Sequence, residues 1–154
     1  QAQGFKLEKV NPAYTSQECR SCGFIARDSR RGNHYRCVCC KRQGHADALA
    51  SANLVERFRQ GRSALTSKHT ALGVQGLQRW AQQLLRLLEQ ATPGTSRHQG
   101  ALGCARAGLA YLQKKNSGAL RRCESLQVLQ ALLNRMSEDS RSIGLNGLST
   151  RYSG

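Results

Sequence analysis

Two pairs of cysteines near the start of the chain restrict its local fold more than any other feature. Cys19 and Cys22 form the first Cys-x-x-Cys pair, Cys37 and Cys40 form the second, and residues 23–36 lie between them. Each pair can form a tight turn that directs two sulfur atoms at one point, and a hairpin of this length brings two such turns together. Four thiolates satisfy the tetrahedral preference of Zn²⁺ and leave no position for water. The spacing therefore predicts a zinc ribbon, a small β-hairpin module with a structural Zn²⁺ ion.

Other residues near the cysteine pairs affect the choice of ligands. Cys39 lies beside Cys40 and could compete with it as a ligand, but the Cys-x-x-Cys spacing favours Cys40. His34 and His45 flank the predicted hairpin and could also bind a metal, although a lone histidine near such a site is more often a surface residue. Gly23 directly follows the first pair and suits the tight turn expected there.

The chain is strongly basic, which points to a polyanionic partner. Its 154 residues have a formal net charge of +15, and nucleic acid is the commonest partner of such a chain. A charge that only maintains solubility is the alternative. Phe24 and Tyr35 could stack on bases or fill the small core of the ribbon, and for Phe24 we expect the core. The candidate phosphate contacts are the basic residues around the two cysteine pairs, namely Arg20, Arg27, Arg30, Arg31, Arg36, Lys41 and Arg42.

The remaining features indicate the compartment. Seven cysteines do not suggest a closed set of disulfides, because the number is odd, and we expect Cys104 and Cys123 to be buried, unreactive thiols. There is no apolar signal segment and no apolar run approaching the roughly 20 residues of a membrane span. We therefore expect a cytoplasmic protein without a membrane partner. Because the sequence begins with Gln1 rather than methionine, we expect a piece of a longer protein.

Hydrophobic periodicity organises the first part of the chain. Apolar and polar residues alternate over residues 4–10, which predicts a short strand within a first segment, 1–14. The zinc ribbon follows at 15–45. Residues 46–60 have the spacing of a helix. The fold class predicted for this part is small α+β.

The rest of the chain is predicted to be helical. Residues 61–137 form an extension with two or three expected helices, at 76–90, at 119–136 and, more weakly, at 101–115. Residues 138–154 are rich in Ser, Gly and Arg, and we expect a flexible tail there.

One stretch carries a more specific signature than a ribbon requires. Residues 10–23 read Val-Asn-Pro-Ala-Tyr-Thr-Ser-Gln-Glu-Cys-Arg-Ser-Cys-Gly, and the second cysteine pair follows at the expected distance. After it come His45-Ala46-Asp47 and residues 50–54, Ala-Ser-Ala-Asn-Leu. Over residues 4–58 this pattern closely resembles the TnpB (OrfB) family of transposon-encoded proteins, which are related to the type V CRISPR effector nucleases.

The resemblance implies a role for each part of the matching region. In this family the ribbon is inserted between a strand and a helix of a RuvC-like, RNase H-type nuclease domain, so residues 1–14 would supply the strand and 46–60 the helix. Asp47 would be the last of three catalytic carboxylates that hold Mg²⁺ ions in an RNA-guided DNA endonuclease. The other two carboxylates would lie upstream, and we expect the chain alone to bind DNA, guide RNA or both without cutting. The implied setting is the prokaryotic nucleoid.

The sequence departs from the family pattern at three positions. Lys41 stands where glycine usually follows the fourth cysteine, Leu49 where the family has Asn, and Ser51 where it has Ala. Without the resemblance, Asp47 would be read as a carboxylate that stabilises a helix N-terminus.

Two other functions fit the same sequence. The chain could be a non-catalytic, stand-alone zinc-ribbon module that binds nucleic acid and carries a helical interaction tail. It could also be a helical interaction protein, in which Leu77, Trp80, Leu84 and Leu88 form a stripe for a partner, although a bundle core is the commoner use of such a stripe.

Overall fold

A computed structural model describes residue 4, residues 7–61 and residues 69–149 of the chain, with side chains from 73 to 141 in the last range. The chain divides into two compact units, residues 1–80 and 81–154. The division lies within helix α2 (His69–Gln90). Residues 150–154 of the predicted tail lie outside the described residues.

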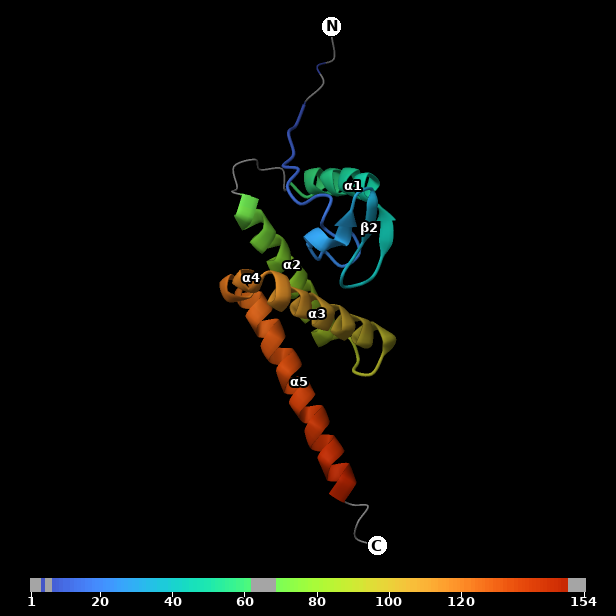
Figure 1. Cartoon of the computed structure of the whole chain (residues 1–154), viewed down its shortest axis with the longest axis vertical. Coiled ribbons are helices and arrows are strands. Elements are labelled where there is room, and N and C mark those ends of the chain that lie inside the picture. The colour runs from blue at the N-terminus through green and yellow to red at the C-terminus, as the bar shows by residue number, and fades with distance from the viewer. Residues whose placement is uncertain (1–3, 5–6, 62–68, 150–154) are drawn as a thin grey trace. The chain divides into compact units, whose positions relative to one another are not determined.

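The N-terminal unit contains the predicted ribbon and helix. A single 3₁₀ turn, η1 (Arg27–Ser29), leads into an antiparallel sheet, and helix α1 (Ala46–Arg59) follows the sheet directly (Figure 1). Tyr35 on the middle strand pairs with residues on both neighbouring strands. The sheet has the strand order β1 (Arg30–Arg31), β2 (His34–Arg36) and β3 (Gln43–His45). The ribbon therefore has a third strand beyond the predicted hairpin, and the helix predicted at 46–60 is confirmed.

The strand predicted within residues 4–10 is wrong for the residues that can be checked. Residues 7–10 form no strand, and Leu7 is 94% exposed. A strand needs a neighbour that takes up its N–H and C=O groups. Within the described ranges no strand pairs with residues 7–10. Alternating hydrophobicity without such a neighbour does not produce a strand over residues 7–10.

Aromatic rings form the centre of the N-terminal unit. Phe24 is fully buried and packs edge to face on Trp80 of α2, with 4.6 Å between ring centroids and 63° between ring planes. Tyr35 and Ala46 are also buried. Phe24 therefore fills the core, as predicted. The stacking of Tyr35 on bases is wrong for this conformation, because its ring is covered.

Helix α1 is attached to the ribbon through buried polar side chains. The Asn53 side-chain amide donates to the carbonyl oxygens of Thr15, at 2.7 Å, and Glu18, at 2.9 Å. The Arg57 guanidinium donates to Asn11 O at 2.8 Å and forms an ion pair with Glu18 at 2.9 Å. Both Asn53 and Arg57 are buried. These bonds fix α1 against the segment that leads into the first cysteine pair.

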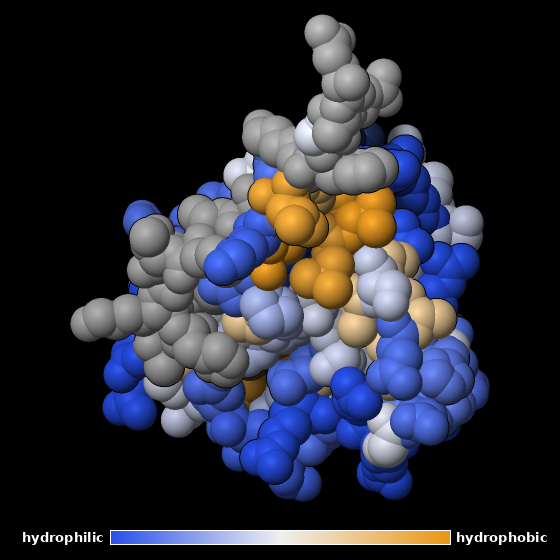
Figure 2. Space-filling view, turned by 90° about the horizontal axis from the view of Figure 1, so that it is seen from above, coloured by the Kyte–Doolittle hydropathy of each residue, from blue (hydrophilic) through white to orange (hydrophobic). Residues whose placement is uncertain are grey.

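Several large hydrophobic side chains of this unit remain exposed. Val55 and Phe58 on α1 are each 49% exposed, in addition to Leu7. Figure 2 shows hydrophobic residues gathered on one face, with hydrophilic residues around them. Part of the apolar surface of α1 is therefore not covered by other described residues of the chain.

The second unit is helical. It comprises the second half of α2, followed by α3 (Ser96–Lys115), α4 (Ser117–Arg122) and α5 (Glu124–Ser149). The predicted helices 76–90 and 101–115 lie within α2 and α3. The core is made mainly of leucines, namely Leu84, Leu88, Leu102, Leu109, Leu112, Leu126, Leu129 and Leu133. The leucine and tryptophan stripe of α2 is buried, so it serves as core rather than as a free partner surface.

The last two helices differ from the prediction. The single helix expected over 119–136 is interrupted at Cys123, which has extended backbone angles (φ −115°, ψ 110°). The Gln127 side chain of α5 donates to the last carbonyls of α4, Leu120 O and Arg121 O, at 3.2 and 3.1 Å. Helix α5 then continues to Ser149, so the flexible tail predicted from residue 138 is wrong over 138–149. Once a helix is formed, each added residue gains one hydrogen bond, and this stretch contains no proline.

No helix in the described ranges is both long enough and apolar enough to cross a membrane.

Candidate metal centre

The two cysteine pairs form the same backbone turn. In the first turn, the Cys19 N–H donates to Phe24 O at 2.9 Å and the Gly23 N–H donates to Cys19 O at 2.8 Å. Both bonds recur in the second turn, where the Lys41 N–H donates to Cys37 O at 3.2 Å. Gly23 has φ 80° and Lys41 has φ 64°. The tight turn predicted from Gly23 is confirmed, and Lys41 occupies the equivalent position in the second turn.

The turns bring four sulfur atoms together. The Sγ atoms of Cys19 and Cys40 lie 3.6 Å apart, those of Cys22 and Cys37 lie 3.5 Å apart, and all four lie within 4.8 Å of one another. Four sulfurs arranged tetrahedrally around zinc at the usual bond length are separated by about 3.8 Å. The four cysteines can therefore bind a metal ion such as zinc. Cys39 is buried outside this group, so the geometry favours Cys40.

The environment of the sulfurs changes their affinity for protons. A hydrogen bond with Cys19 lowers the pKa of Cys37 to about 6. Burial raises the pKa of Cys40 to about 11. A metal ion binds thiolates, so its binding must displace the proton of Cys40 and release it to solvent.

The predicted alternatives to the cysteines do not join the cluster. His34 and His45 are exposed and lie outside the sulfur group. His45 instead caps α1, because its Nδ1 accepts the Asp47 N–H at 3.3 Å. Cys104 and Cys123 are buried in the helical unit, as expected.

Asp47 lies exposed in the first turn of α1. Its Oδ1 faces the Arg30 Nη2 of β1 at 3.4 Å, and the two side chains are 65% and 35% exposed, respectively. The Arg30 Nε also donates to Gly32 O at 3.0 Å. In the part of the chain that the structure describes, no group of three or more ligand residues forms around Asp47.

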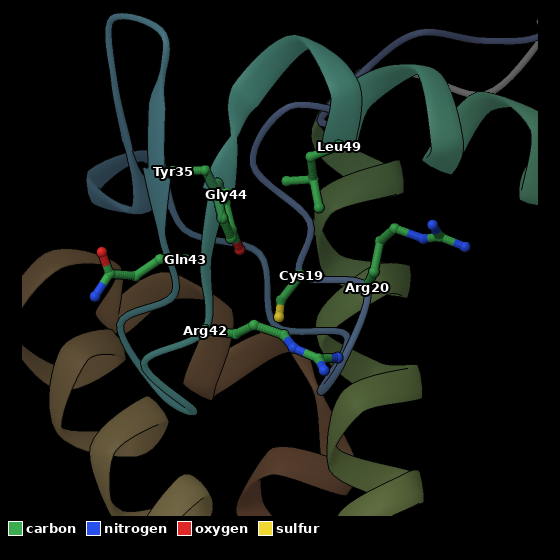
Figure 3. A pocket seen from close by; sticks show the side chains of 7 residues that line it. All are labelled: Cys19, Arg20, Tyr35, Arg42, Gln43, Gly44 and Leu49. Atoms are coloured by element: carbon green, nitrogen blue, oxygen red, sulfur yellow. The ribbon is translucent and has the colours of Figure 1, made fainter.

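A cavity of about 430 Å³ opens beside the sulfur cluster (Figure 3). Arg20 and Arg42 are exposed at its edge. The lining residues are Cys19, Arg20, Tyr35, Arg42, Gln43, Gly44 and Leu49. The cavity therefore joins one basic residue from each cysteine turn, next to the predicted metal site.

The other predicted phosphate contacts are distributed over the ribbon surface. Arg30 is partly buried and engaged with Asp47. The remaining members of the set are exposed, namely Arg27, Arg31, Arg36 and Lys41. The structure thus brings Arg20 and Arg42 to one cavity and leaves the other exposed cations outside it.

Tyr35 lies between the core and the sulfur cluster. Burial raises the pKa of its phenol above the ordinary value, and the nearby Cys19 and Cys37 raise it further. Its hydroxyl is buried and makes no hydrogen bond within the described residues.

Sequence reasoning missed the residues that hold α1 in place. Asn53 lies in the segment that carries the family resemblance, which was the available signal for it. Arg57 gave no signal, because an arginine on an amphipathic helix normally faces solvent. Gln43 and Gly44 line the cavity only because β3 pairs with β2.

Comparisons with known proteins agree with this site. Residues 1–54 match the family described as "Cas12f1-like, TNB domain". Over 52 residues the chain is 38% identical to the CRISPR-associated endodeoxyribonuclease Cas12f1 of Sulfoacidibacillus thermotolerans, a match that covers 33% of this chain and 12% of that relative. No solved structure matches the chain. Over its first 54 residues, the chain is therefore similar to the TNB domain of Cas12f1-like proteins, which supports the resemblance to the TnpB/Cas12-related family.

Proposed function

We propose that this chain is the nucleic-acid-binding zinc-ribbon portion of a TnpB/Cas12-type RNA-guided DNA endonuclease. The observation that carries the proposal is the four-cysteine cluster with Arg20 and Arg42 at the adjacent cavity. Guanidinium groups bind phosphate oxygens through paired hydrogen bonds. The bound Zn²⁺ holds the two turns together, so that Arg20 and Arg42 are presented to DNA or guide RNA.

Asp47 would contribute one carboxylate to a RuvC-type site completed by other parts of the nuclease. Its exposure on the first turn of α1 supports this role, because a metal ligand must be reachable from outside the ribbon. In the complete site, Mg²⁺ would activate water for phosphodiester cleavage.

The exposed apolar residues of α1 support a ribbon that packs against further protein. Val55 and Phe58 would be covered when α1 forms part of a larger nuclease domain. A stand-alone ribbon module is the second candidate function. It is favoured by the polar contacts of Asn53 and Arg57, which anchor α1 to the ribbon without other protein.

Replacing both cavity arginines tests the proposal. We expect Arg20→Gln/Arg42→Gln to weaken binding of a 20-nucleotide DNA or RNA. The slope of log affinity against log salt concentration is negative and should become less negative by about 1.5, because each lost phosphate contact removes 0.7 to 0.9 from its magnitude. Fluorescence anisotropy at several salt concentrations gives both quantities.

A matched control separates local contacts from net charge. Arg59→Gln/Arg86→Gln removes two exposed cations elsewhere, and it should change the slope much less. An equal loss of affinity and of salt dependence in the two variants would show that the net positive charge, and not the two cavity arginines, accounts for binding. Mg²⁺-dependent cleavage by the purified chain that disappears in Asp47→Ala would contradict the assignment of a partial site.

A further inference from the structure

The helical unit contains a long stretch without negative charge. Residues 90–123 contain six Lys and Arg residues and no Asp or Glu. Four of these cations lie within nine residues, at the junction of α3 and α4. They are Lys114, Lys115, Arg121 and Arg122, and all four are exposed. We refer to them as the junction cations.

The helices around the junction are held in place by side-chain hydrogen bonds. Gln127 of α5 donates to the last carbonyls of α4. The Gln113 side chain donates to Gln130 Oε1 at 3.1 Å, and Gln130 donates to Asn134 Oδ1 at 3.1 Å. Three of the cations, Lys114, Arg121 and Arg122, form no ion pair with any described residue. They are therefore available to an external anion on a fixed support.

A surface groove lies next to this end of α3. It has a volume of about 220 Å³, and its lining includes Arg106, Gln113, Gln130 and Asn134. Side-chain amides can hydrogen-bond to base edges and sugars, whereas guanidinium groups bind phosphates.

We propose that the junction cations form a second binding surface for the sugar–phosphate backbone of nucleic acid, separate from the ribbon. The proposal deepens the proposed function, because it assigns a ligand to the unit that lies outside the family match. Basic residues in the last turn of a helix also stabilise the helix dipole. A dipole role alone would change stability and leave nucleic-acid affinity unchanged.

The test uses the zinc-loaded full chain and the variant Lys114→Gln/Arg121→Gln/Arg122→Gln. For a 20-nucleotide DNA or RNA, the slope of log affinity against log salt concentration should become less negative by 2 to 3, because each lost phosphate contact removes about 0.7 to 0.9 from its magnitude. The control Arg97→Gln/Arg135→Gln/Arg141→Gln removes the same charge from exposed sites away from the junction, at the start of α3 and in the middle of α5. Its slope should change by less than 1.

Two results would overturn the proposal. One is an equal fall in the junction and control variants. The other is an unchanged slope in the junction variant. If that variant also loses binding to vesicles containing phosphatidylserine, the ligand of the junction cations is a membrane surface. The Arg20→Gln/Arg42→Gln variant, measured in parallel, shows whether the ribbon binds nucleic acid even if the helical unit does not.

A second inference concerns the buried hydroxyl of Tyr35, which has no hydrogen-bond partner among the residues that the structure describes. Tyr35 and Cys19 line the same cavity, and Figure 3 shows the phenol oxygen directed toward the Cys19 sulfur. Ser29 lies near this phenol and accepts the Val38 N–H at 3.3 Å, but the Tyr35 hydroxyl makes no hydrogen bond with it in this structure. A thiol is a weak hydrogen-bond acceptor, whereas the thiolate of a metal-bound cysteine is a strong one.

We infer that Tyr35 is a positioning residue that donates a hydrogen bond to the Cys19 thiolate when the four cysteines hold a metal ion. Such outer partners of a metal ligand change metal affinity 10- to 100-fold. The inference predicts that removing the hydroxyl while keeping the ring weakens metal binding.

Tyr35→Phe provides the test, with zinc affinity measured by chelator competition. We expect an increase in Kd of about tenfold and a shifted sulfur-to-metal charge-transfer band in the cobalt-substituted protein. If the hydroxyl stayed unpaired in the metal-bound protein, its removal would leave the affinity unchanged or raise it. That opposite sign, with an unshifted cobalt spectrum, would overturn the inference. Tyr14→Phe in the same unit is the control.

Discussion

Lys41 adopts a backbone conformation that favours glycine. Its φ of 64° corresponds to the φ of 80° at Gly23 in the first cysteine turn. A side chain in this left-handed region is destabilised by about 1 kcal/mol. The Lys41 ammonium donates to Val38 O at 2.6 Å, and this hydrogen bond offsets part of the destabilisation. The departure of this sequence from the family's glycine therefore falls where the turn requires a positive φ.

Replacing Lys41 should show this strain. In the metal-loaded protein we expect Lys41→Gly to be about 1 kcal/mol more stable than Lys41→Ala, because both variants lose the ammonium and only alanine keeps a Cβ. Guanidinium denaturation followed by tryptophan fluorescence measures the difference through Trp80. An alanine variant as stable as the glycine variant would show that the turn relaxes without strain.

Elements fixed by local spacing could be predicted from the sequence, whereas elements fixed by long-range contacts could not. The ribbon was predictable because four cysteines at fixed spacing leave few arrangements of the turns. The anchoring of α1 was not predictable, because the partners of Asn53 and Arg57 lie 35 to 46 residues earlier in the chain. The strand expected at residues 4–10 was wrong over residues 7–10 for the same reason, since pairing depends on a distant neighbour.

Helix α1 should depend on Asn53. Asn53→Ala removes the side-chain donor of two carbonyl oxygens, the buried one of Thr15 and the part-buried one of Glu18. We expect a loss of about 2 kcal/mol in the free energy of unfolding. The control Ser51→Ala removes an exposed hydroxyl that donates to Asp47 O and should change stability by less than about 0.5 kcal/mol. Denaturant titration of both variants measures these changes in the free energy of unfolding. A similar loss in the two variants would contradict the anchoring role of Asn53.

At the scale of the whole molecule, the two units rely on different sources of stability. The ribbon has few large apolar residues and two turns held at the cysteines, so metal binding should supply about 10 kcal/mol of its folding free energy. The helical unit has a leucine core that contains no metal group within the described ranges. Its helices were largely predictable from periodicity, whereas the break at Cys123 was not, because no proline or glycine marks it.

Chelation should therefore affect the units separately. We expect metal removal to leave most of the helical circular dichroism at 222 nm unchanged, while the edge-to-face contact of Phe24 and Trp80 is lost and tryptophan fluorescence changes. Loss of most of the helical signal on chelation would show that the two units unfold together.

The central claim is that a zinc-dependent ribbon binds nucleic acid. The most direct test is the zinc content of protein purified under reducing conditions, together with oligonucleotide affinity before and after chelation. We predict one Zn²⁺ per chain and an affinity at least tenfold lower after its removal. Absence of zinc, or an affinity that does not change when zinc is removed, would contradict the account.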